Sequence, residues 1–71
     1  MRMKVSDLKR LSSTSDEWRT KSGFAMVIFP SGIIGARTPD GRYTELEDVT
    51  TDPVKAKRFF IQWANSNPYD Q

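Results

Sequence analysis

The densest group of side chains able to do chemistry lies in the acidic segment, residues 45–52. Its carboxylates are Glu45, Glu47, Asp48 and Asp52. Such a group could bind a hard cation, but a calcium loop needs oxygen ligands at regular alternate positions and a glycine at its turn, and this segment has neither. The carboxylates also lie directly before a predicted helix, where the helix dipole favours negative charge. We therefore expect no metal and no cofactor.

Two residue types that carry much enzyme chemistry are absent from the chain. It contains no cysteine and no histidine, which excludes thiolate nucleophiles, disulfides, imidazole bases and the common zinc sites. The hydroxyls of residues 12–15 could pair with Lys9 or Lys21, but nothing in the sequence marks either lysine as desolvated. Residues 32–35 have the GxxG spacing of a KH-domain loop, but they fall in a predicted turn and strand rather than between two helices. We predict that the protein is not an enzyme.

Candidate protein-binding residues lie in two places. Trp18 and Arg19 belong to the polar stretch 16–21, and tryptophan and arginine are enriched at binding hot spots. Trp18 could instead cap one side of the core, and the sequence leaves both interpretations open. The acidic residues Glu45, Glu47 and Asp48 are the other candidates.

Basic residues indicate a second kind of partner. The chain has 11 lysines and arginines against 9 acidic residues, a formal net charge of +2. Some of these basic residues form a row on the polar side of the predicted C-terminal helix. Such a row is usually only a solvated face, but it could also contact the phosphates of a nucleic acid. The N-terminal basic residues join this row only if their segment packs beside the helix. The candidate nucleic-acid-binding residues are Lys9, Arg10, Lys55, Arg58 and Gln62.

The clearest element is a helix over residues 54–65. Thr51 or Asp52 is a good N-cap, and Pro53 suits the first helical position. One arc of this helix is apolar and the opposite arc is polar, which is the pattern of a helix packed on a core. The sequence at 65–68 ends the helix because the residue before a proline avoids the α region. The apolar arc consists of Phe59, Trp63, Ala56, Phe60 and Ala64, flanked by Ile61 and Val54.

Three strands are predicted in the middle of the chain, at residues 24–29, 33–38 and 42–47, with turns at 30–32 and 39–41. The first 22 residues carry a weaker pattern. They favour a short helix at 6–11, followed at 16–22 by either a helical turn or an additional edge strand carrying Trp18.

The predicted fold is one small α+β domain over residues 1–71. A three-stranded, or four-stranded, antiparallel meander packs on the C-terminal helix in the order (α)βββα, and residues 67–71 form a frayed tail. This order resembles that of double-stranded-RNA-binding domains, whose basic helix start is echoed at residues 55–58. It is also similar to that of the arm-binding domains of phage-type integrases. Element order alone assigns no family.

The strand at residues 24–29 is apolar on both faces. Phe24, Met26 and Ile28 alternate with smaller or aromatic apolar residues, whereas an antiparallel sheet covered by one helix needs a single apolar face. We expect the N-terminal segment, a second copy of the chain or a partner to cover the other face. A homodimer is therefore one of the expected states.

Size and composition favour action by binding rather than by turnover. We expect a stoichiometric regulator or inhibitor of a larger protein or nucleoprotein machine, of the kind found among phage and mobile-element accessory proteins. The alternative is a nucleic-acid-binding module that uses the basic helix face and the basic N-terminal segment. The N-terminus has no apolar stretch typical of a signal peptide, and the longest apolar run, residues 24–29, is far shorter than the roughly 20 residues of a membrane span. A cytoplasmic location is the expectation.

Overall fold

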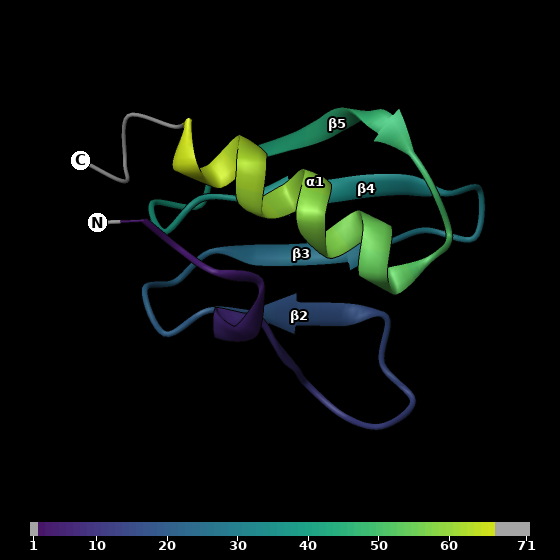
Figure 1. Ribbon diagram of the computed structural model, residues 1–71, viewed down its shortest axis with the longest axis horizontal. Coiled ribbons are helices and arrows are strands. Elements are labelled where there is room, and N and C mark those ends of the chain that lie inside the picture. The colour runs from purple at the N-terminus through teal and green to yellow at the C-terminus, as the bar shows by residue number, and fades with distance from the viewer. Residues whose placement is uncertain (1, 67–71) are drawn as a thin grey trace.

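Within residues 2–66, five short strands follow one another, and one α-helix comes after them (Figure 1). The computed structural model describes residues 2–66, so the predicted frayed tail at 67–71 lies outside the described residues. The sheet order is β1-β2-β3-β4-β5, and every neighbouring pair is antiparallel. The elements are η1 (Val5–Asp7), β1 (Lys9–Arg10), β2 (Glu17–Arg19), β3 (Ala25–Ile28), β4 (Ile33–Arg37), β5 (Tyr43–Val49) and α1 (Pro53–Asn65).

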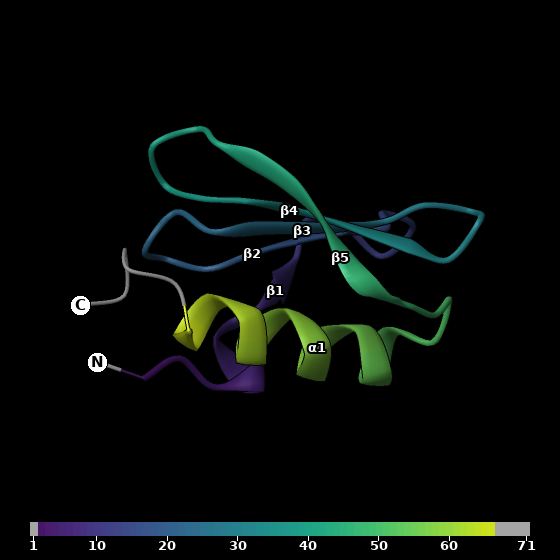
Figure 2. The same ribbon diagram turned by 90° about the horizontal axis from the view of Figure 1, so that it is seen from above.

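The molecule has two layers, with α1 and η1 on the same side of the sheet (Figure 2). The core lies between these layers, and Met26, Ile34 and Phe60 are its largest fully buried side chains. Phe60 packs edge-on against Phe24, with their ring centroids 6.4 Å apart. The remaining buried apolar residues are Met3, Leu8, Trp18, Ile28, Ala36, Ala56, Ile61 and Ala64.

The structure confirms the predicted helix and its cap. The Asp52 carboxylate accepts a hydrogen bond from the Val54 N–H at 3.0 Å, and Pro53 occupies the first turn, where its missing N–H costs nothing. The buried arc is rotated from the predicted one, because Ile61 is buried while Phe59 and Trp63 are only half-buried. The helix therefore presents one aromatic edge that the sheet does not cover.

The N-terminal segment packs beside α1 rather than under the sheet. The Met3 N–H donates to Asn65 Oδ1 at 2.8 Å, and Asn65 Nδ2 donates to the Met3 carbonyl at 3.0 Å. Ile61 lies one turn before Asn65 on the same side of the helix, which places it next to this segment. The segment thus shares the core with α1 and leaves the opposite face of the sheet uncovered.

The predicted helix at 6–11 is wrong. Its first half is the single 3-10 turn η1, in which the Asp7 carboxylate accepts the Lys4 N–H at 2.8 Å. Leu8 then adopts an extended conformation, and the chain enters β1. Extended geometry separates the two leucines of this stretch, so that Leu8 is buried whereas Leu11 is exposed.

The α+β class is confirmed, but the strand count is five rather than three or four. Of the two alternatives for residues 16–22, the strand carrying Trp18 is the one found, as β2. The extra strand β1 pairs with it, and this pairing continues through the Leu11 N–H, which donates to the Glu17 carbonyl at 3.1 Å. The element order of the two nucleic-acid-binding domain types named above is therefore not the order of this chain.

Candidate functional site

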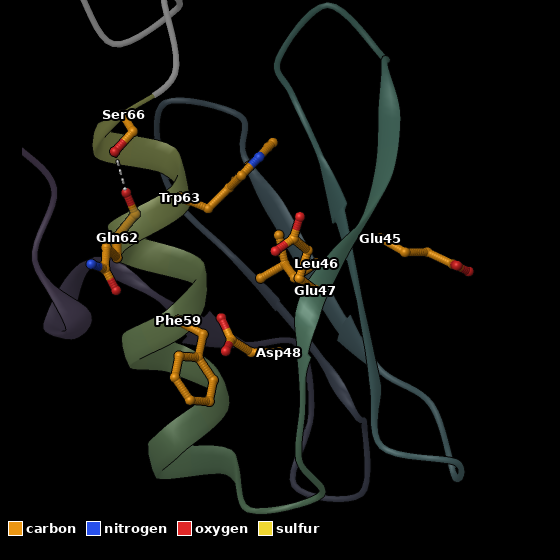
Figure 3. Close-up of a pocket in the computed structure, with 8 residues that line it drawn as sticks. All are labelled: Glu45, Leu46, Glu47, Asp48, Phe59, Gln62, Trp63 and Ser66. Atoms are coloured by element: carbon orange, nitrogen blue, oxygen red, sulfur yellow. Dashed lines mark hydrogen bonds between the residues drawn. The ribbon is translucent and has the colours of Figure 1, made fainter.

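A groove of about 470 Å³ runs between β5 and α1 (Figure 3). Its apolar side chains are Leu46 from the strand and Phe59 and Trp63 from the helix, and all three are half-buried. The polar residues that line it are Glu45, Glu47 and Asp48 on β5, and Gln62 and Ser66 on α1.

The groove forms because α1, which packs across β3, β4 and β5, leaves one side of its apolar arc only partly covered. The helix buries Ala56, Phe60 and Ala64 in the core. Phe59 and Trp63, one turn apart on the adjoining side of the helix, line the groove, and Trp63 also packs against the core ring of Phe24, with the centroids 6.0 Å apart. Leu46 is the one residue of β5 that is not exposed, so the strand supplies a single side chain to meet the two aromatic rings. Apolar surface therefore stays accessible along this edge.

The outer edge of β5 carries backbone groups that pair with no other described strand. Within residues 2–66, β5 pairs only with β4. The Thr38 N–H donates to the Arg42 carbonyl at 2.9 Å, and the Thr50 N–H donates to the Gly32 carbonyl at 2.8 Å. Inward and outward backbone groups alternate along an antiparallel strand, so those of Tyr43 and Glu45 point to the free edge.

Three carboxylates surround this edge without a cationic partner. Glu45, Glu47 and Asp48 form no salt bridge with any residue between 2 and 66, whereas Glu17 pairs with Arg19 at 3.1 Å. Figure 3 shows Asp48 beside Phe59, whereas Glu45 points away from α1. Negative charge thus lies on both sides of the strand. The predicted acidic candidates are brought together at one site.

Glu45 also acts on its neighbour Tyr43. Desolvation raises the pKa of the Tyr43 phenol above its ordinary value of 10.0, and the charge of Glu45 and the hydrogen bond that its carboxylate accepts at 3.4 Å raise it further. Arg37 acts in the opposite direction. The phenol therefore stays protonated at neutral pH and donates to Glu45.

The sheet face opposite α1 carries a second group of candidate binding side chains. The strand register places Arg19, Ala25, Arg37 and Tyr43 in one row across this face. In the next row a Cβ on Gly35 would lie 2.7 Å from Tyr43 Oη, 2.9 Å from Val27 Cγ1 and 3.0 Å from Phe29 Cε2. The rings of Tyr43 and Phe29 therefore converge on the glycine, and 50% and 37% of these two residues stay exposed.

This open face confirms that the central strand β3 is apolar on both sides. Met26 and Ile28 are buried against the helix layer, while Ala25 and Val27 are half-buried on the other face. No described segment crosses that face, because η1 and α1 both lie on the other side (Figure 2).

Of the two interpretations of Trp18, the structure supports the one that places it in the core. Trp18 is only 4% exposed and belongs to the core, because alternation in β2 points it to the helix side while Glu17 and Arg19 point to the open face. The Arg10 guanidinium lies over the Trp18 ring, 5.2 Å from its centroid. Arg19 is exposed, as predicted, but it lies on the open face and away from the groove.

The predicted nucleic-acid-binding residues do not form one surface. Lys9 pairs with Arg19 across β1 and β2 and so lies on the open face, while Arg10 points to the helix side with Trp18. Lys55 and Arg58 are exposed on α1, in the other layer. Gln62, the remaining candidate, lines the acidic groove.

Sequence reasoning assigned Phe59 and Trp63 to the core and so missed their place in the groove. Both residues belong to the same apolar arc as the buried Phe60, so the sequence carried no local signal that separated them from the core.

The rest of residues 2–66 adds two observations. No three acidic side chains in this part of the chain are grouped so that they could hold a metal ion. No helix in it has the length and apolar character that crossing a membrane requires.

Comparison with known proteins gives no family assignment. The chain matches no protein-family model, and no curated protein or solved structure is significantly similar to it.

Proposed function

We propose that this chain is a non-enzymatic binding protein that contacts a larger protein, alone or within a nucleoprotein assembly, through the groove between β5 and α1. It acts stoichiometrically, as a regulator or inhibitor. The observation that carries the proposal is the half-buried state of Leu46, Phe59 and Trp63 beside an unpaired strand edge. Aromatic side chains that stay accessible in a groove are typical of binding hot spots, where tryptophan is enriched.

The hydroxyl side chains of the chain support binding rather than turnover. Ser15 Oγ accepts the Glu17 N–H at 3.0 Å, and Ser12 and Thr14 share a hydrogen bond of 3.5 Å. These contacts order the loop between β1 and β2. Lys9 and Lys21 are exposed, so neither amine is held in a desolvated pocket of the kind that activates a catalytic lysine.

Site-specific photo-crosslinking tests the proposal. We expect a benzoylphenylalanine at position 62, in the groove, to capture one protein partner in the cells that make this chain. The same group at Ser13, in the exposed loop, should not capture it. Once purified, the partner should bind the unmodified chain at a one-to-one ratio in calorimetry. Equal capture from both positions, or turnover of the partner by substoichiometric amounts of the chain, would contradict the proposal.

A second candidate function is single-stranded nucleic-acid binding on the open sheet face. The observation that favours it is the pair of exposed rings, Tyr43 and Phe29, that converge on Gly35 beside Arg37 and Arg19. Unpaired bases stack on such rings, and arginines neutralise the phosphates. This surface replaces the predicted basic helix face.

Fluorescence anisotropy with a labelled single-stranded oligonucleotide tests this second function. If it holds, the oligonucleotide binds at about 50 mM salt. As salt is added, the logarithm of the binding constant falls against the logarithm of the salt concentration with a slope of about −0.7 per phosphate contacted. Tyr43→Ala should then weaken binding by about 1–3 kcal/mol, the worth of one stacked base. Arg58→Ala, on the helix, is the matched control and should have no effect. No binding at low salt removes this candidate.

A further inference from the structure

We propose that the groove accepts an extended segment in which basic and apolar residues alternate, and that this segment adds to the free edge of β5 as a sixth strand. The inference rests on the proposed function and specifies the chemistry of the partner. Strand addition combines backbone hydrogen bonds, which give affinity, with side-chain pockets, which give specificity.

The two edges of the sheet differ in what they offer such a segment. β5 has seven residues, which at about 3.4 Å per residue is roughly 24 Å of strand. Its outward backbone groups, at Tyr43 and Glu45, are the ones that an added strand would pair with. The other edge strand, β1, has two residues and is too short to serve as a template.

The side chains around β5 define what an added strand must carry. Alternate residues of that strand point to opposite faces of the sheet. Those on the helix side enter the groove against Leu46, Phe59 and Trp63, so they should be apolar. Those on the other side lie next to Glu45, which points away from α1 (Figure 3), so they should be basic.

The charge at this edge selects among possible occupants. Glu45, Glu47 and Asp48 have no cationic partner within residues 2–66, and a basic strand would supply one. Antiparallel pairing of β5 with β5 of a second copy would bring the unpaired carboxylates of both copies to one seam, which is unfavourable. The expected homodimer is thus disfavoured at this edge. Charges on an edge strand also protect it from non-specific pairing. The acidic side chains of β5 therefore disfavour pairing with any strand that is not basic.

A synthetic peptide tests the inference directly. The probe is an acetylated and amidated peptide, as long as β5, that alternates lysine and valine. At concentrations up to about 1 mM, which reaches weak affinities, we expect it to shift the NMR amide signals of β5 and of the second half of α1. The amides of Tyr43 and Glu45 should become protected from hydrogen exchange. A peptide that alternates glutamate and valine is the control for charge and should not bind.

A modified peptide and a pair of charge-reversal variants separate strand addition from simple charge attraction. N-methylation of alternate peptide amides removes the donors that face β5 and should abolish binding if the peptide pairs as a strand. Glu45→Lys should weaken binding about tenfold, whereas Asp16→Lys, which makes the same charge change beside β2, should change it less than twofold.

The outcomes distinguish this inference from the function on which it rests. Absence of peptide-induced shifts, or equal binding of the N-methylated peptide, overturns strand addition. If position 62 still captures a partner in that case, the proposed function stands without strand addition. If the peptide binds as expected but no partner is captured, the groove chemistry is right and the proposed function fails.

Discussion

Replacing Phe60 with alanine is expected to unfold the protein at 25 °C. Phe60 is fully buried at the centre of the interface between α1 and the sheet, with ring contacts to Phe24 at 6.4 Å and Trp63 at 5.6 Å. Loss of a buried phenylalanine side chain costs about 3–5 kcal/mol. A single core in a domain of this size supplies only about 3–5 kcal/mol in total, so the variant has no margin left.

Circular dichroism and urea titration measure this effect. The control is Val54→Ala on the same helix, because Val54 is 54% exposed and its truncation should change the free energy of unfolding by less than about 0.5 kcal/mol. A Phe60→Ala variant that unfolds cooperatively near the wild-type midpoint would contradict the packing described for the helix.

Trp18→Ala is expected to lower the free energy of unfolding by about 3–5 kcal/mol, as for other buried aromatic residues. The physical reason is the position of Trp18 in the core under Arg10, where the indole leaves a cavity when it is removed. Urea titration followed by the fluorescence of Trp63, the remaining tryptophan, measures the loss.

Trp18→Phe separates a core role from a binding role. This variant keeps most of the buried aromatic volume, and we expect it to stay folded and to bind the partner, or the lysine–valine peptide, as the wild type does. If Trp18→Phe were as stable as the wild type but failed to bind, Trp18 would be a binding anchor after all.

The sequence predicted those elements whose signals are local. The helix at 53–65 carries its own cap at Asp52, its proline and a 3.6-residue apolar period. The three central strands are bounded by turn residues such as Gly41, whose φ of 92° suits glycine. These features act within a few residues of each other, so they can be recognised without knowledge of the tertiary structure.

The N-terminal strands could not be predicted in the same way. β1 has two residues and β2 has three, which is too short for an alternating pattern to be distinguished from a helical turn. Both strands depend on pairing, since Lys9 and Arg10 have no apolar face of their own. Tertiary contacts decide their conformation.

The candidate site was predicted only in its charged half. Glu45, Glu47 and Asp48 stand out in the sequence because they are clustered. That Phe59 and Trp63 stay half-buried depends on where α1 crosses the sheet, and no local pattern fixes that position.

The hydrogen bonds between Met3 and Asn65 have a consequence for the order in which the protein folds. They join residues 62 positions apart, whereas every strand of the sheet pairs with its neighbour in the sequence. Closing a long loop costs more entropy than closing a short one, so we expect the hairpins and α1 to come together before the N-terminal segment docks. β5 and α1 both belong to the part expected to form first, and the groove between them would then be complete before the chain closes on itself.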